Sequence, residues 1–320
     1  MTEIKFIDLF CGVGGFHIAM GEASSYLDVA ASCVFASDID ATCRENYRLN
    51  FGLEPVGDIT KIDPIEIPAH DLLFAGFPCQ PFSIIGQMKG FEDTRGTLFF
   101  HIANILKVRS PRAFVLENVK MLRGHDGGRT LKVILKTLQD LGYSVKLSVL
   151  NALDYGLPQK RERLIIVGHK IDGFEFQFPE PQESYKPLSE LLEKKVDPKY
   201  FASDYIREKR ISSHKPAHKP AIWHENKSGN ISSYPYSCAL RASASYNYLL
   251  VDGLRRLTPR EMFRLQGFPD TFRITPNEFQ ARKQAGNSVP VNLIRATLTN
   301  LLPALASAIS PEYVPTEKRG

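Results

Sequence analysis

The chain has 320 residues, 43% of them apolar, which suffices for one large domain or two ordinary ones with a substantial core. The five cysteines form no Cys-x-x-Cys pair, so neither a disulfide framework nor a zinc ribbon is expected, and no metal site is predicted. No apolar run approaches about 18 residues, and no signal peptide opens the chain. These properties exclude a membrane-spanning or disulfide-stapled protein and predict a soluble, intracellular one.

Strand-like and helix-like stretches alternate through the first half of the chain. The apolar spacing predicts helices over 15–23, 40–49, 97–108 and 129–141. Between them, the predicted strands are 4–9, 33–37, 71–76, 112–116, 144–149 and 163–168. This alternation predicts an α/β fold with a doubly wound, mostly parallel, Rossmann-like sheet.

The second part of the chain has a different composition. After about residue 180, prolines occur among Ser, Lys and Tyr with little periodicity, which predicts a second, smaller and loop-rich domain. A regular pattern returns from Gln284, and residues 289–309 are predicted to form a long, mainly apolar helix.

The net charge of +5 is unevenly distributed along the chain. Residues 186–260 contain 14 Lys plus Arg against 7 Asp plus Glu, whereas the remainder contains 26 against 28. Six tyrosines and one tryptophan are interleaved with these charges: Tyr200, Tyr205, Trp223, Tyr234, Tyr236, Tyr246 and Tyr248. A basic stretch on its own is a solvated protein face about as often as it is a binding surface. The mixture of basic and aromatic residues, however, suits phosphate contacts and readout of a nucleic-acid groove.

Cys79 is the first candidate for chemistry. It follows the predicted strand 71–76, and ligands in open α/β sheets collect at the carboxyl ends of such strands. A free cysteine is more often a small core residue. Here, however, Pro78 and Pro81 fix backbone torsions and remove amide donors where a regular element would need them. The pattern therefore predicts an exposed nucleophile.

The ends of the first strands carry the elements of a nucleoside pocket. Three glycines within residues 10–15 would let a ligand approach the backbone closely. A dinucleotide fingerprint needs another glycine where His17 stands, so a pyrophosphate cofactor is not favoured. Asp38 follows the second strand, where ribose hydroxyls are bound in such folds, and Asp58 adds an acid at a loop rim. Each could be an ordinary turn residue, but together they fit a nucleoside such as S-adenosylmethionine.

An acid and two arginines complete the candidate site. Glu117 follows the strand 112–116 and would lie beside Cys79 if the two strands are neighbours. The run 159–163, Gln-Lys-Arg-Glu-Arg, precedes the strand 163–168 and supplies fixed cations, although alone it would be a charged surface turn. Thiol, acid and guanidinium at the strand ends of one sheet, next to a nucleoside pocket, predict an active site.

Seven motifs in order resemble those of bacterial cytosine-5 DNA methyltransferases, particularly the compact members of restriction-modification systems. The resemblance covers nearly the whole chain, through residues 8–15, 57–59, 76–80, 117–119, 159–163, 256–261 and 284–289. It implies a catalytic and cofactor-binding domain of residues 1–188 plus 273–320 and a target-recognition domain of residues 189–272, where the basic, aromatic segment lies.

The resemblance implies S-adenosylmethionine as cofactor, S-adenosylhomocysteine as product, and no metal. The implied cofactor residues are Phe10, Gly12, Gly14, Gly15, Asp38, Ile39, Asp58, Ile59, Gly76, Pro78, Leu98, Asn287 and Val289. The family often has an aromatic residue where this chain has Ile39, so adenine stacking on that side is expected to be weaker.

The resemblance also implies a mechanism. Cys79 adds to carbon 6 of a flipped-out cytosine so that carbon 5 can attack the sulfonium methyl group. Glu117 holds a proton toward ring nitrogen 3, Arg161 and Arg163 favour the thiolate, and Arg163 contacts the base carbonyl. The loop 81–96 closes over the base.

The implied DNA contacts come from the loop and the basic segment. They are Gln80, Ser83, Ile85, Arg95 and Arg241. Ile85 stands where the family's intercalating residue is often a serine, so the wedge is expected to be apolar.

Partners and alternatives follow from the same pattern. We expect double-stranded DNA as substrate, a monomer in the bacterial cytoplasm, and a cognate restriction endonuclease without a stable complex. A transfer-RNA cytosine-5 methyltransferase shares the motif series, but tends to have threonine near residues 81–83, here Pro-Phe-Ser. A catalytically idle DNA-binding regulator would not need Cys79, Glu117 and Arg163. An amino-methylating enzyme would need an Asp/Asn/Ser-Pro-Pro-aromatic motif, and a thiol hydrolase a histidine base, neither of which the motifs provide.

Overall fold

The computed structural model describes residues 3–78 and 98–310, which form two compact units. The first comprises the described residues of Met1–Leu150, Glu162–Pro179 and Ile294–Gly320, and the second Asn151–Arg161 and Glu180–Leu293. No helix in the described ranges has the length and apolar character needed to cross a membrane.

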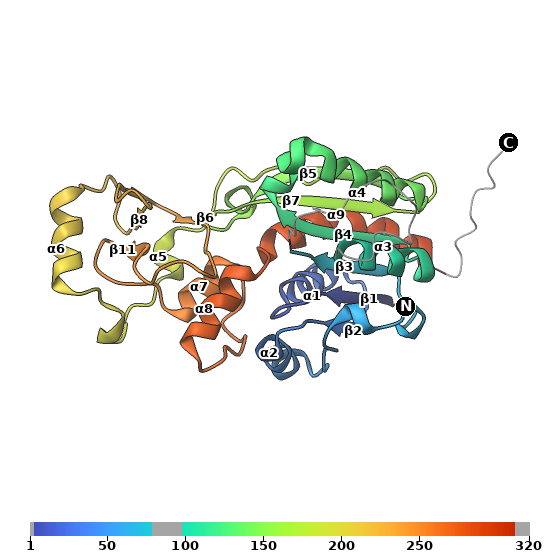
Figure 1. Cartoon of the computed structure of the whole chain (residues 1–320), viewed down its shortest axis with the longest axis horizontal. Helices are drawn as coiled ribbons and strands as arrows, with labels where there is room; N and C mark the ends of the chain where they lie inside the picture. Colours follow the sequence, from blue (N-terminus) through green and yellow to red (C-terminus); the bar gives the residue numbers. More distant parts are fainter. Residues whose placement is uncertain (1–2, 79–97, 311–320) are drawn as a thin grey trace. The chain divides into compact units, whose positions relative to one another are not determined.

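A six-stranded sheet forms the centre of the first unit. Its strands are β1 (Ile4–Leu9), β2 (Ala31–Ser37), β3 (Leu72–Gly76), β4 (Ala113–Val119), β5 (Ser144–Asn151) and β7 (Glu162–His169). Their order is β2-β1-β3-β4-β7-β5, with β2, β1, β3 and β4 parallel and β7 antiparallel to β4 (Figure 1). The predicted α/β fold with a mostly parallel sheet is confirmed.

Helices cover both faces of this sheet. They are α1 (Gly15–Leu27), α2 (Ala41–Phe51), α3 (Leu98–Arg109), α4 (Arg129–Asp140) and α9 (Val291–Ile309). Alternate strand residues such as Leu73 and Ala75 pack with buried residues of α3 and α4, including Phe99 and Ile134. Phe74 points to the other face, and stacks on Phe16 of α1 with ring centroids 5.1 Å apart. The apolar alternation thus gives each face its own helical layer.

The second unit is built from short elements. Its helices are α5 (Leu188–Leu191), α6 (Asp204–Ser213), α7 (Pro259–Leu265) and α8 (Glu278–Asn287). An antiparallel sheet has the order β11 (Leu249–Val251), β8 (Ile222–Glu225) and β9 (Ile231–Tyr234), and β6 (Gln159–Lys160) pairs in parallel with β10 (Ser237–Cys238). The predicted recognition segment 189–272 lies within this unit, which is larger by residues 151–161, 180–188 and 273–293. The functional boundary stays a prediction.

Candidate active site

The loop between β1 and α1 adopts left-handed backbone torsions at three positions. Phe10, Gly12 and Gly14 have φ angles of +55°, +53° and +86°. At Gly14 a Cβ atom would lie 2.2 Å from Cε2 of Phe51, so both torsion and packing require glycine there. Beside Gly12, in contrast, no atom of the described residues other than its own chain neighbours lies within 4 Å of the Cβ position. The loop therefore presents open backbone directly before α1.

The carboxyl group of Asp38 ties this loop to the end of β2. One oxygen accepts a hydrogen bond from the backbone N–H of Gly12 and the other from that of Asp40, both at 2.8 Å. Burial raises the pKa of Asp38 from its ordinary value. Next to it, the side chain of Ile39 is 76% exposed. An acid held at this position, with further lone pairs on both oxygens, fits the hydroxyls of a ribose.

Asp58 and its neighbours lie beside the same strand. Val56 forms a parallel bridge with Ser37 of β2, and Asp58 caps a short 3-10 turn, Ile59–Lys61. The Asp58 carboxylate accepts from the N–H and hydroxyl of Thr60, which lowers its pKa.

The next strand leads toward the predicted nucleophile. Gly76 ends β3, Pro78 is exposed, and Leu98 begins α3. The predicted nucleophile Cys79 lies outside the described residues, as do Gln80, Ser83, Ile85 and Arg95.

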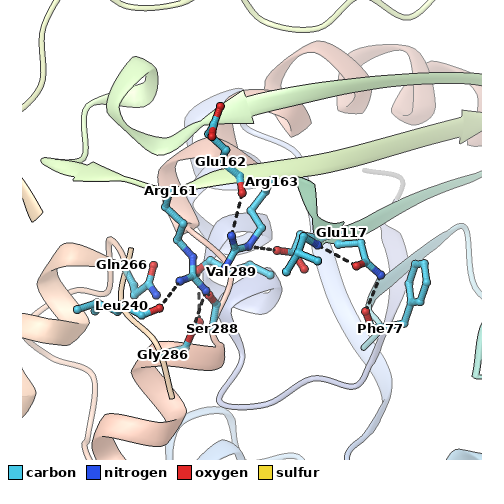
Figure 2. A network of polar contacts seen from close by, with 12 residues as sticks. Phe77, Glu117, Arg161, Glu162, Arg163, Leu240, Gln266, Gly286, Ser288 and Val289 are labelled. Atoms are coloured by element: carbon cyan, nitrogen blue, oxygen red, sulfur yellow. Dashed lines mark hydrogen bonds and ion pairs between the residues drawn. The ribbon is translucent and has the colours of Figure 1, made fainter. Parts of the chain in front are cut away.

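Glu117 and Arg163 are brought together. Glu117 pairs in register with Gly76 of β3, and Arg163 Nε lies 2.7 Å from Glu117 Oε1 (Figure 2). Their side chains are 12% and 14% exposed. β4 continues to Val119, so Glu117 lies inside the strand and not after it, a correction to the predicted boundary. Because β7 is antiparallel to β4, its first residues lie at the edge where β4 ends.

A buried amide supports the same edge. The side chain of Asn118 donates to the carbonyl of Phe77 at 2.9 Å, and its oxygen accepts from the N–H of Val119. Asn118 thereby fixes the backbone two residues before Cys79. The sequence singled out Glu117 in this motif and gave no role to its neighbour.

Arg161 belongs to the second unit and is buried, with 1% of its surface exposed. Its guanidinium donates to the carbonyls of Leu240, Gly286 and Ser288 at 2.9, 2.9 and 2.7 Å (Figure 2). The sequence suggested that Arg161 acts on the thiol of Cys79. Cys79 lies outside the described residues, so this role of Arg161 stays a prediction.

Two thiols of the first unit, those of Cys11 and Cys33, have raised pKa values. Burial raises the pKa of Cys11, and raises that of Cys33 to about 12. His17 stacks on Phe51 with ring centroids 4.0 Å apart, and burial lowers its pKa to about 4. Its Nδ1 lies 2.8 Å from the hydroxyl of Tyr47. Cys11 is buried, whereas Cys33 and His17 are partly buried and both lie beside the hydroxyl of Tyr47.

Two arginines of the second unit stack on tyrosines. The guanidinium of Arg241, an exposed residue, lies 4.8 Å from the ring centroid of Tyr248, whose hydroxyl accepts the Arg241 backbone N–H. Arg282 lies 3.7 Å from the ring centroid of Tyr246. Such stacking orients a planar cation, which favours phosphate or base contacts. Arg282 lies on α8, beyond the segment in which the sequence placed DNA recognition.

The remaining predicted cofactor residues lie at the end of α8. Asn287 is the last residue of that helix and is exposed, whereas Val289 is buried. Across residues 3–78 and 98–310, no three His, Cys, Asp or Glu side chains are grouped so as to hold a metal ion.

The sheet, the glycine loop after β1 and the acid after β2 define the fold of an S-adenosylmethionine-dependent methyltransferase. Solved structures share it. A Schizosaccharomyces pombe Dnmt2 methyltransferase matches with a TM-score of 0.72 and 21% identity, over 95% of this chain and 99% of that one. A putative DNA modification methyltransferase of an Escherichia coli prophage also has a TM-score of 0.72, at 20% identity.

Sequence comparison identifies the family. The model of the C-5 cytosine-specific DNA methylases matches residues 4–302. The type II methyltransferase M.NgoBI of Neisseria gonorrhoeae is 57% identical, over 92% of this chain and 91% of its own length. M.HaeII of Haemophilus aegyptius is 52% identical, over 98% and 97%. M.HhaI of Haemophilus parahaemolyticus is 39% identical, over 94% and 95%. The chain belongs to this family and is a DNA (cytosine-5)-methyltransferase.

Proposed function

We propose that this methyltransferase modifies carbon 5 of a flipped-out cytosine through a covalent bond between Cys79 and carbon 6. The register of β3 and β4 carries the proposal. Gly76 lies opposite Glu117, and Arg163 pairs with Glu117, so the acid and guanidinium lie at the edge of the sheet toward which β3 leads. Cys79 follows three residues after Gly76.

The residues after β1 and β2 would hold the cofactor. The open backbone at Gly12 and the fixed carboxyl group of Asp38 fit the nucleoside part of S-adenosylmethionine, and Asp58 adds a further acceptor. Ile39 offers an exposed aliphatic side chain for the adenine. When bound, S-adenosylmethionine supplies an electrophilic methyl group. We also propose that Asn287 and Val289 contribute to cofactor binding.

The protein groups act on the cytosine ring. The Cys79 thiolate forms a bond with carbon 6, and the electron pair of the 5,6 double bond becomes available at carbon 5. Glu117 holds a proton toward ring nitrogen 3, and Arg163 donates to the base carbonyl, so the charge that builds on the ring is neutralised. After methylation, a base removes the proton on carbon 5, the double bond reforms and the sulfur leaves.

We further propose the biological setting. The target duplex is recognised by residues 189–272, whose Arg241 is stacked and exposed. The target cytosine is extruded from the stack at a cost of a few kcal/mol. Three relatives are named type II methyltransferases. This supports a role beside a cognate restriction endonuclease, and we propose that the enzyme acts as a monomer in the bacterial cytoplasm.

A duplex carrying 5-fluorocytosine tests the mechanism. Fluorine cannot leave carbon 5 as a cation, so elimination is blocked after methylation. We expect a covalent complex that survives denaturing electrophoresis, forms only with S-adenosylmethionine, and maps by mass spectrometry to the peptide containing Cys79. Cys79→Ala is the matched control and forms no complex. A crosslink through another cysteine, or no adduct from an enzyme that methylates ordinary duplex DNA, contradicts the mechanism.

A further inference from the structure

A buried hydrogen-bond network connects β6 with two distant segments of the second unit. Gln159 and Arg161, two residues apart on an extended stretch, are 0% and 1% exposed. Gln159 accepts from the backbone N–H of Leu240 at 3.0 Å, and Arg161 donates to the carbonyl of the same residue at 2.9 Å. Both backbone groups of Leu240 are therefore fixed by the motif 159–161.

The same two side chains reach the region around α8. Gln159 donates to Gln266, which in turn donates to the carbonyl of Ala285 at 2.6 Å. Arg161 donates to Gly286 and Ser288, on either side of Asn287. One guanidinium thus holds the residue before Arg241 and the two residues that flank Asn287.

The two segments also touch directly. At Gly286 a Cβ atom would lie 2.5 Å from the backbone nitrogen of Ala242 and 2.9 Å from the carbonyl carbon of Arg241. Contacts this short to backbone atoms leave no room for a side chain, so glycine is needed for the approach. A shift of residues 240–242 would therefore change the packing against Gly286 at the end of α8.

We propose that Arg161 is a positioning residue that couples DNA binding at Arg241 to cofactor binding at Asn287. The inference rests on the proposed function, which places these two residues at the DNA and the cofactor. The planar guanidinium donates in fixed directions to three carbonyls, so moving one segment disturbs the bonds to the other. A ligand that orders one segment then favours the ordered form of the other, which is a coupling free energy between sites.

Arg161→Lys tests this coupling. Lysine keeps the positive charge but cannot reproduce the fork that reaches three carbonyls. We would measure S-adenosylhomocysteine binding by calorimetry with and without the target duplex. In the wild type the duplex should tighten binding on the order of 10-fold, within the usual range for coupled sites. In Arg161→Lys this factor should fall below about 2-fold.

A second variant and a control separate coupling from general destabilisation. Gly286→Ala separates the two segments by another route and should also lose the coupling. Arg255→Lys removes the two-pronged donation to the buried carboxylate of Glu261 in the same unit and should keep the wild-type factor, even with a lower Tm. If Arg161→Lys retains the coupling, or loses no more than Arg255→Lys, the inference is overturned.

The pH dependence of Cys79 alkylation distinguishes the alternative in which Arg161 acts on the thiol. We expect wild type and Arg161→Lys to give the same profile, and a shifted profile would overturn the positioning role. A wild type that methylates DNA but shows no coupling contradicts this inference alone. A wild type that methylates no duplex contradicts the proposed function as well.

Discussion

Glu117 and Arg163 illustrate how single residues acquire a role from their strands. Each side chain would be an ordinary surface charge elsewhere, but here both are nearly buried and 2.7 Å apart. Removing one partner of such a pair leaves the other charge without compensation. The pair therefore fixes the direction of both groups before any base arrives.

Replacing Glu117 by glutamine should slow methyl transfer strongly. The amide has nearly the same shape but cannot deliver a proton to ring nitrogen 3, so we expect a loss of roughly two to four orders of magnitude. The single-turnover rate with saturating duplex is the measurement. Glu175→Gln is the control, because that residue forms an exposed pair with Lys146 and should leave the rate unchanged. An unchanged rate in Glu117→Gln would remove Glu117 from the mechanism.

The glycine loop shows what an element requires of one position. Gly14 precedes α1, and its φ of +86° and the ring of Phe51 both exclude a side chain. Glycine at this position therefore lets the loop before α1 pack closely against Phe51 of α2, beside the proposed nucleoside site.

Gly14→Ala should displace this loop. The new Cβ atom must push away Phe51 and adopt a left-handed torsion, so we expect S-adenosylhomocysteine binding to weaken at least about 10-fold, as for a loss of about 1.4 kcal/mol. Calorimetry measures the binding. Gly21→Ala is the matched control, since Gly21 lies inside α1 with no atom within 4 Å of the Cβ position. It should bind normally and unfold at the same or higher temperature. Equal binding by both variants would argue against the loop as cofactor site.

Sequence patterns predicted the elements of the first unit better than those of the second. The predicted strands 4–9 and 71–76 correspond closely to β1 and β3, because apolar strands bounded by turns give a strong signal. The direction of β7 is not encoded in its periodicity, which is why its antiparallel pairing with β4 was not predicted. In the second unit, strands of two to four residues are too short to show a period.

The residues of the candidate site could be predicted from the sequence only in part. Asp38, Glu117 and Arg163 could be placed because they lie at or within a few residues of a strand end, although Glu117 lies inside β4 and not after it. The contacts of Arg161 could not, because its partners lie 79 to 127 residues away in the chain. The alternation of Gln159 and Arg161 was the only available signal, and it indicates a shared face without naming what covers it.

The distribution of charge over the whole molecule leads to a prediction about specificity. Segment 186–260 carries the excess of basic residues, and Arg241 within it is exposed and stacked on an aromatic ring. Exchanging residues 189–272 for those of a relative with another target should transfer the methylated sequence, which bisulfite sequencing of a plasmid would show. Binding should weaken steeply with salt, because each neutralised phosphate releases counterions. A chimera that keeps the original target would place readout outside this segment.

The long-range contacts of Arg161 also determine when its hydrogen-bond network can be completed during synthesis. Ser288, one of its three acceptors, is made 127 residues after Arg161. At typical elongation rates the arginine emerges roughly 6–25 s before that acceptor. Until then the Arg161 guanidinium lacks one of its three acceptors, so we expect this network to be completed only after residue 288 has been made.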